Sequence, residues 1–262
     1  MTEPSPGEIY LERCRELADC VGGQMDTIRR VADLFSGTIQ AGRMVHLFAS
    51  GHSRILVEEM WPRYGSFPGF NPIVELSLTF HNLVVGANGQ RQAMFLENVS
   101  GLAARILRNY DLSIQDSALV ISSSGCNVVP IEIAAGFQDA GVPVIALVSL
   151  RHLEASQSRD PKGRKLTDVA DFVLDTGAPA GDAMVQIAGL AEPVAPGSTV
   201  GGAMVVNALK AELAQRLTDS GHPPKVLAAG AVVGAERATE LFESAYDEHA
   251  RRLAALYANL GM

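Results

Sequence analysis

The chain has 262 residues, of which 47% are hydrophobic and 19% are charged, as in an ordinary globular protein with a substantial core. Its 21 basic and 29 acidic residues give a formal charge of −8, which argues against the broad basic surface of a nucleic-acid-binding protein. No stretch reaches the roughly 18–20 apolar residues of a membrane span, and the first residues lack the basic start and apolar run of a signal peptide. The three cysteines, an odd number without zinc-binding spacing, suit a reducing compartment. We therefore expect a cytoplasmic protein without nucleic-acid or membrane partners and without a metal or other cofactor.

The order of elements along the chain predicts an α/β fold. A helical pattern covers residues 8–41, and the pair Gly22-Gly23 is placed to interrupt it. Strands are predicted where short apolar runs occur, at residues 45–49, 118–121, 142–148 and 170–174. Further helices are predicted at residues 55–61, 128–140, 199–218 and 234–260, and polar loops at 75–95 and 151–167. Apolar strands that alternate with helices indicate a doubly wound parallel sheet, which binds ligands at the carboxyl ends of its strands.

The clearest ligand-binding signal is a turn between the second apolar run and its helix. Its sequence is Ser122-Ser123-Ser124-Gly125-Cys126-Asn127. Unpaired N–H groups at a helix N-terminus, three hydroxyls and a glycine that lets a ligand approach the backbone suit a phosphate. The alternative is that the serines only cap the helix, but one serine suffices for that. This turn therefore predicts an anion site.

A second donor-rich turn, Ser50-Gly51-His52-Ser53, follows the first apolar run. Neither G-x-G-x-x-G nor a Walker A pattern occurs in the chain, so two such turns favour a small phosphorylated metabolite over a nucleotide. His52 is expected to reach the hydroxyls or the phosphate of this ligand. Later in the chain, Ser198 and Thr199 are expected both to cap a helix and to touch the ligand.

Together, the two turns resemble the signature turns of the sugar-isomerase (SIS) domain family. The first turn has Ala49 where the family usually has glycine, and the second has Asn127 where Ser or Thr is frequent. The resemblance covers roughly residues 43–220. Three further segments are similar to a phosphosugar-acting bacterial subgroup, namely Ser158-Arg159, Gly163-Arg164-Lys165-Leu166 and Gly181-Asp182-Ala183.

The resemblance implies a fold, a phosphate site and an assembly. The fold is a five-stranded parallel sheet in a flavodoxin-like three-layer sandwich, with helical extensions at residues 1–42 and 221–262. The residues that hold the phosphate are Ser53, Ser122, Ser124 and Asn127. The family's usual assembly is a homodimer or a dimer of dimers with sites near the subunit interface.

The reaction needs acid and base groups besides the phosphate site. A carboxylate that removes the C2 proton of an open-chain sugar phosphate starts either isomerisation or elimination, and a second group must then donate a proton. Glu58 and Glu59 are adjacent on a helix, so at most one faces the site; Glu59 is predicted, against a solvated surface role. Glu97 is predicted at a helix start in a segment that resembles the Leu-Glu-x-Ala start of N-acetylmuramic acid 6-phosphate etherases, where this glutamate takes part in elimination. The alternative is a glutamate placed there by the helix dipole.

The remaining candidates lie in the predicted loops. His81 is predicted to protonate a leaving oxygen, the alternative being an ordinary hydrogen-bonding role. His152, Arg159 and Lys165 are candidate positive groups near the strand ends, and a solvated loop explains them equally well.

Three functions follow from these residues. The first is a lyase that dehydrates an amino-sugar 6-phosphate, resembling N-acetylglucosamine 6-phosphate dehydratases and, more distantly, the muramic acid etherases. The Glu59/Glu97 pair favours this reading. The second is a phosphoheptose-type isomerase, which typically uses a histidine on a late helix; residues 199–218 contain none. The third is a non-catalytic phosphosugar sensor.

Overall fold

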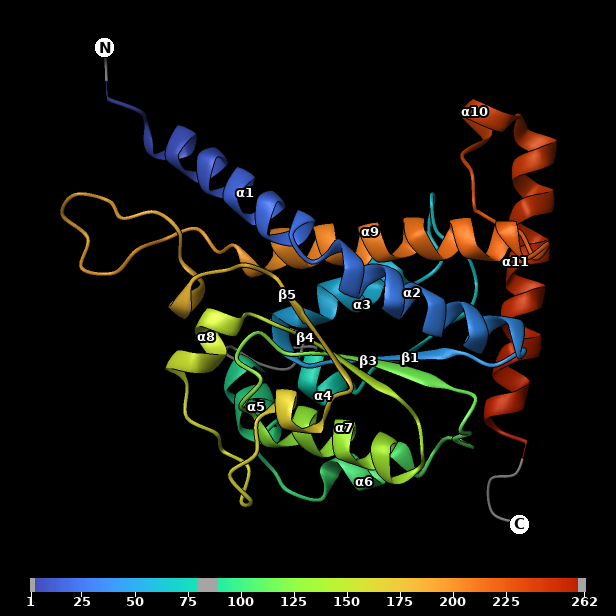
Figure 1. Ribbon diagram of the computed structural model, residues 1–262, viewed down its shortest axis with the longest axis horizontal. Coiled ribbons are helices and arrows are strands. Elements are labelled where there is room, and N and C mark those ends of the chain that lie inside the picture. The colour runs from blue at the N-terminus through green and yellow to red at the C-terminus, as the bar shows by residue number, and fades with distance from the viewer. Residues whose placement is uncertain (1–2, 80–88, 259–262) are drawn as a thin grey trace.

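A computed structural model describes residues 3–79 and 89–258. Its centre is a five-stranded sheet in the order β2-β1-β3-β4-β5, and all neighbouring strands are parallel (Figure 1). In chain order, the strands are β1 Val45–Ala49, β2 Phe70–Ile73, β3 Ser117–Ile121, β4 Val144–Val148 and β5 Phe172–Asp175. The strands predicted at residues 45–49, 118–121, 142–148 and 170–174 correspond to β1, β3, β4 and β5.

The strand without an apolar signature of its own is β2. It contains Asn71 and Pro72 and pairs with β1 alone, so that Leu47 is in register with Pro72. Proline lacks the N–H that a ladder requires, and it is tolerated in strands that have a free edge. The position of β2 at the edge of the sheet therefore explains why a four-residue segment with this composition is a strand.

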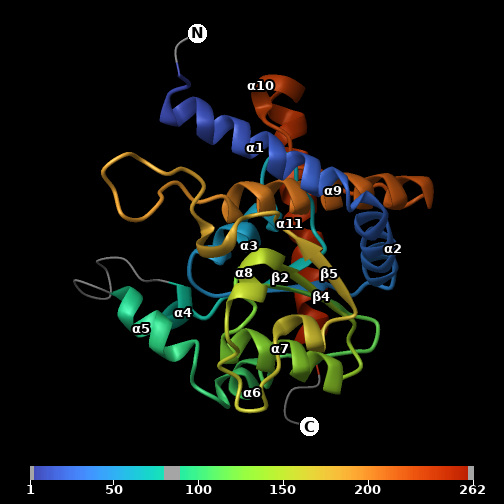
Figure 2. The same ribbon diagram turned by 60° about the vertical axis from the view of Figure 1, so that its left-hand side comes forward.

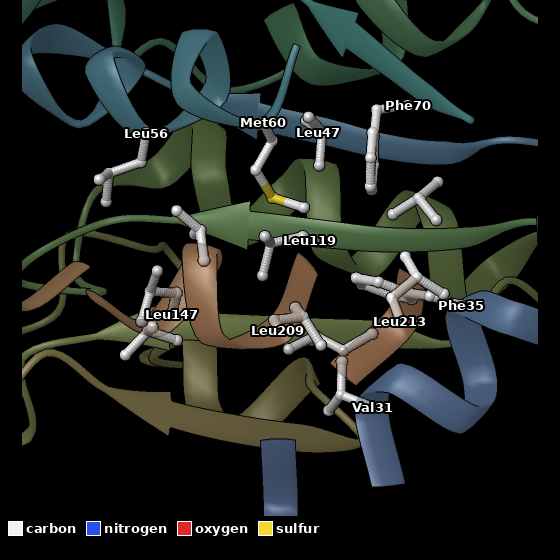
Figure 3. Packing of buried hydrophobic residues seen from close by; sticks show 14 of the residues in the cluster. Val31, Phe35, Leu47, Leu56, Met60, Phe70, Leu119, Leu147, Leu209 and Leu213 are labelled. Carbon is white, nitrogen blue, oxygen red and sulfur yellow. The ribbon is translucent and has the colours of Figure 1, made fainter. Parts of the chain in front are cut away.

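One face of the sheet is covered by the helices α1 Pro6–Gly22, α2 Met25–Gln40, α3 Arg54–Met60 and α9 Ser198–Asp219. The predicted interruption at Gly22-Gly23 is confirmed, because α1 ends at Gly22. Phe35 from α2 and Leu209 from α9 pack with Leu47 and Leu119 of the sheet (Figure 3). These four side chains are fully buried. The core on this face of the sheet contains more buried residues than the core on the opposite face.

The opposite face is covered by α6 Leu102–Leu107, α7 Val128–Asp139 and the short 3-10 helix η3 Leu166–Val169. Phe48 and Val120 point to this side and pack with Phe137 of α7. Because successive residues of a strand face opposite ways, β1 and β3 contribute alternately to both cores. Helices on both faces of a five-stranded parallel sheet confirm the predicted doubly wound α/β fold.

The two predicted loops contain helices that the sequence did not reveal. Residues 75–95 include α4 Leu76–Thr79 and the first part of α5 Gly89–Leu96, and residues 151–167 include most of α8 Leu150–Ala155. These helices are four to eight residues long, too short for their apolar spacing to stand out. Two further 3-10 turns are η1 Gly51–Ser53 and η4 Ala180–Asp182.

The C-terminal helix α11 Ala235–Leu256, preceded by α10 Gly230–Val233, crosses the end of the sheet away from α5 and α8 (Figures 1 and 2). Arg252 fixes it by donating from Nη1 to the carbonyl oxygens of Ile39 and Arg43 at 2.9 and 3.0 Å. Within the described ranges, no helix is long and apolar enough to cross a membrane.

A buried ion pair joins the amino ends of β1 and β3. The Arg43 guanidinium donates to both carboxylate oxygens of Asp116 at 2.8 Å, and the Ser113 N–H donates to the same carboxylate at 2.8 Å. The His46 ring nitrogen Nε2 lies 3.4 Å from it. Burial alone would raise the pKa of Asp116, but these partners outweigh it and lower the pKa to about 2. The ionised carboxylate therefore belongs to the folded state.

We expect acid to destabilise the protein through Asp116. Its pKa is lower in the folded chain than in the unfolded chain, where it is about 4, so its contribution of about 2 kcal/mol is complete above pH 4 and is lost as the pH falls towards 2. Asp116→Asn should reduce the free energy of unfolding at pH 7 and flatten its dependence on pH below 4, as measured by urea unfolding. Asp26→Asn, at an exposed position, is the control. An unchanged pH dependence in Asp116→Asn would contradict this account.

Candidate functional site

A cavity of about 710 Å³ lies where β1 and β3 end. In a sheet of this order the chain runs off in opposite directions from these two neighbouring strands, which leaves a crevice between the turns that follow them. Helices α5 and α8 lie near the same end of the sheet (Figure 1). The cavity is lined from both turns, from α5 and from the segment after α8, by Ser50, Gly51, His52, Ser53, Gln90, Ala93, Met94, Glu97, Ser122, Ser123, Ser124, Cys126, Asn127, His152, Ser156, Gln157, Ser158 and Arg159.

The turn after β3 combines a rigid frame with free polar groups. Ser122 is fixed, since its N–H donates to the Leu147 carbonyl at 3.0 Å and its Oγ accepts from the Gly125 N–H at 3.2 Å. Ser123 Oγ is buried without a hydrogen-bond partner among the described residues. Asn127 is the N-cap of α7, yet its side chain makes no capping bond. Of the first residues of α7, Val129 donates its N–H to the Glu97 carbonyl at 2.9 Å and Pro130 has no N–H, so the helix start offers an anion fewer amides than predicted.

Gly125 has a different role from the one predicted. It does not line the cavity; its φ is +59°, and an added Cβ would lie 2.8 Å from Leu153 Cδ1 of α8. The left-handed backbone turns the chain into α7, and the missing side chain makes room for α8. The glycine is therefore needed for the conformation of the turn and for its packing against α8, whereas the sequence predicted that it would let a ligand approach the backbone.

We expect Gly125→Ala to lower the free energy of unfolding by about 2 kcal/mol, because it adds steric overlap with Leu153 to backbone strain. Gly51→Ala is the matched control: Gly51 has nearly the same φ, +57°, but nothing lies within 4 Å of the added Cβ. Gly51→Ala should lower the free energy of unfolding by about 1 kcal/mol, from backbone strain alone. Equal losses in urea unfolding of the two variants would show that contact with α8 is unimportant.

Arg159 is brought to the cavity by a loop folded over the N-terminus of α7. Its N–H donates to the Cys126 carbonyl at 2.9 Å, and its Nη1 donates to Asn127 Oδ1 at 3.1 Å. The loop is held by an ion pair between Arg164 and Asp160 at 2.9 Å. Among the described residues that line the cavity, Arg159 is the one lysine or arginine. The sequence marked it only as one of three loop cations, because nothing in the chain indicates that the loop folds back onto Cys126.

Glu97 lines the cavity from the end of α5. It follows the last residue of this helix, so the prediction that it starts a helix is wrong, and the helix dipole does not explain its presence. Its carboxylate accepts from Ser50 Oγ at 2.9 Å, and its carbonyl accepts from the Val129 N–H of α7 at 2.9 Å. Removal from water raises the pKa of Glu97, although the Ser50 hydrogen bond, the charge of Arg159 and a hydrogen bond from the Asn127 side chain oppose the shift. The cavity thus contains a carboxylate of increased basicity.

Glu59 lies elsewhere, between α3 and α9. Its oxygens are 2.5 Å from Arg63 Nη1, 3.1 Å from Asn207 Nδ2 and 3.9 Å from Lys210 Nζ. Burial raises the pKa of this carboxyl, but these three partners together lower it below the ordinary value. Glu59 does not line the cavity, and its neighbour Glu58 pairs with Arg54. The two acids predicted to work together are therefore not brought together.

The histidines and hydroxyls are distributed as follows. His52 and His152 line the cavity, and His152 Nδ1 is buried without a hydrogen-bond partner in residues 3–79 and 89–258. His81 lies outside the described residues. Ser198 and Thr199 line a smaller, neighbouring cavity, and the prediction that they cap α9 is wrong, because its N-cap is Gly197, which has no side chain to make a capping bond. No three His, Cys, Asp or Glu side chains of the described residues gather in a way that would hold a metal ion.

Comparison with known proteins agrees with this fold. Residues 9–149, more than half of the chain, match the SIS domain. The UPF0309 protein of Geobacillus kaustophilus is 32% identical over 240 residues, which cover 91% of this chain and 93% of the relative. That of Listeria innocua is 30% identical over 246 residues, covering 94% and 96%. The structure of Vibrio vulnificus NanR complexed with ManNAc-6P is similar with a TM-score of 0.42 and 14% identity, over 92% of this chain and 65% of that one. The chain belongs to the SIS domain family.

Proposed function

We propose that the protein is a lyase that dehydrates an amino-sugar 6-phosphate, most simply N-acetylglucosamine 6-phosphate, after Glu97 removes the proton at C2. The observation that carries this proposal is the position of Glu97, a carboxylate of raised pKa in the cavity that also receives the N-terminus of α7. One wall of the cavity supplies donors for a phosphate, and the other supplies a base.

The phosphate is held by the second turn. The Val128 N–H at the start of α7, the Ser124 hydroxyl and the Asn127 amide are donors at the positive end of the helix dipole. Arg159 adds a full positive charge at the rim. From the first turn, Ser53 approaches the same cavity, as the family resemblance implies. These groups bind and orient the substrate without taking part in bond making.

The base is Glu97. A carboxylate is a weak base at its ordinary pKa, and removal from water makes it a stronger one. The hydrogen bond from Ser50 fixes the orientation of one oxygen, and the Asn127 side chain also interacts with this carboxylate. Removal of the C2 proton of the open-chain aldehyde gives an enolate. When the C3–O bond then breaks, its oxygen takes up a proton and leaves as water, and a C2–C3 double bond remains.

The proton for the leaving oxygen comes from a second group. His81 is the predicted donor and lies outside the described residues. Of the described residues, His52 and His152 line the cavity and are the alternatives. Loss of the alkaline limb of the pH–rate profile in one of the three His→Gln variants would identify the donor.

A phosphosugar isomerase is the second candidate, because both reactions begin with removal of the C2 proton. The argument for elimination from two paired acids no longer holds, since Glu59 lies outside the cavity. What favours elimination is the likeness of the sequence around Glu97 to the etherase segment, although here it follows the end of a helix, and the absence of histidine from α9.

The test is to incubate the protein with N-acetylglucosamine 6-phosphate in deuterated water and to follow the products by NMR. Loss of water with formation of an unsaturated sugar supports the lyase. Deuterium at C1 or C2 without loss of water supports the isomerase. Binding without either change would leave the protein a phosphosugar sensor and refute both enzyme proposals.

A further inference from the structure

A second cavity of about 300 Å³ adjoins the first. The two cavities share His52, Ser53 and Ser123, so a ligand in one is in contact with groups that line the other. The second cavity extends beneath the ends of β3 and β4 towards the start of α9. No role in phosphate binding or proton abstraction requires it.

The floor of the second cavity is apolar. Leu56 of α3, Ile121 of β3 and Leu147 of β4 are nearly or fully buried side chains that line it. Thr176, Ser198 and Thr199 also line it with their hydroxyls, and Thr176 is as deeply buried as Ile121. A hydrated sugar hydroxyl or a charged group loses water on such a floor without gaining a partner, whereas a methyl group is stabilised there.

The N-terminus of α9 does not attract an anion into this cavity, because Asp182 already occupies it. Asp182 Oδ1 accepts from the N–H groups of Gly197 and Ser198 at 3.0 and 2.7 Å, and Oδ2 accepts from Ser198 Oγ at 2.6 Å. These three bonds orient the carboxylate and occupy most of its acceptor positions, but its negative charge remains. The two cavities therefore differ in charge: the one with Arg159 suits a phosphate, and the one lined by Asp182 does not suit an anion.

At the junction of the two cavities lies Ser123. Its Oγ is buried and has no hydrogen-bond partner in the described part of the chain. A buried hydroxyl without a partner is unfavourable, and a ligand amide, which has both a donor and an acceptor, satisfies it. A hydroxyl at the junction followed by an apolar floor matches an amide followed by a short alkyl group.

We propose that this second cavity binds the acyl substituent on the C2 nitrogen of the sugar, so that the protein selects N-acylated over free amino sugars. The acyl chain lies on Leu56, Ile121 and Leu147, and its amide bonds to Ser123 Oγ. This inference rests on the proposed function, since it assumes that the phosphate and C2 are placed as described above. The cavity is larger than an acetyl group needs, so a propanoyl group should be accepted as well.

The test is calorimetric titration of Glu97→Gln protein, which does not consume the ligand, with three sugars: glucosamine 6-phosphate and its N-acetyl and N-propanoyl derivatives. We expect both acyl derivatives to bind at least about tenfold more tightly than the free amine. Adding Thr199→Leu, which partly fills the cavity, should remove this preference. Val200→Leu, next to it on α9 but outside the cavity lining, is the control and should keep the preference.

Ser123→Ala tests the amide contact in the same assay and should reduce the preference without abolishing it. Equal affinities for the three sugars, or a preference that Thr199→Leu leaves intact, would overturn the inference while the proposed lyase function stands. A clear acyl preference without turnover by the unmodified protein would refute the lyase and leave the acyl site in place. Absence of binding by all three sugars would refute both.

Discussion

Glu97→Gln is expected to reduce turnover of N-acetylglucosamine 6-phosphate by about 10²–10⁴-fold, the range typical for loss of a general base. Gln keeps the shape of the side chain and can still accept from Ser50 Oγ, so the turns should remain in place. The Val128 N–H and the Ser124 hydroxyl, which are proposed to bind the phosphate, are untouched, and affinity for the substrate should stay within a few fold of the original. Steady-state kinetics together with calorimetric titration of the same two proteins separate the two effects.

Glu59→Gln is the matched control, because the sequence alone predicts that both glutamates are catalytic. Glu59 is paired with Arg63, Asn207 and Lys210, and its loss leaves the buried Lys210 ammonium with fewer partners. We expect lower stability and nearly unchanged kinetics. Normal turnover in Glu97→Gln would remove Glu97 from the mechanism, and strongly reduced turnover in a folded Glu59→Gln would show that the second acid acts after all.

Arg159→Gln is expected to weaken binding of the phosphorylated sugar by about tenfold, since a charge-assisted contact to the phosphate is lost at a solvent-exposed rim. The weakening should shrink at high salt, where the contribution of an exposed charge is screened. Gln can still donate to Asn127, so the loop should remain folded. Calorimetric titration at low and high salt measures both effects.

Lys162→Gln is the control for Arg159→Gln. Lys162 lies in the same loop and carries the same charge, but it does not line the cavity. Its substitution should leave the affinity unchanged. Equal weakening by the two substitutions would mean that the overall positive charge of the loop attracts the ligand and that Arg159 makes no specific contact.

Much of the fold follows from local sequence patterns. The apolar runs that became β1, β3 and β4 are buried on both sides of the sheet, and such strands are recognisable without alternation. The partly exposed β5 was recognisable from its short apolar run. Strand β2 is not recognisable in this way, because its pairing with β1 alone lets it contain Asn71 and Pro72. It was expected only from the family resemblance.

The parts of the candidate site that could be predicted are those whose residues lie in one continuous segment of the sequence. The turn at Ser122–Asn127 is such a segment, and its position between β3 and α7 follows from the local pattern. Glu97 and Glu59 were not resolved by the sequence, because the end of α5 and the orientation of α3 depend on contacts with Val129 and Lys210, which are distant in the chain. The domain limits of 43–220 and the dimer remain predictions.

The most direct test of the proposed site is a crystal structure of Glu97→Gln with N-acetylglucosamine 6-phosphate bound. The account predicts phosphate oxygens about 2.7–3.2 Å from the Val128 N–H at the start of α7, from Ser124 Oγ and from the Asn127 side chain, with C2 of the sugar facing residue 97. A phosphate bound elsewhere, or a sugar whose C2 faces away from residue 97, would contradict it.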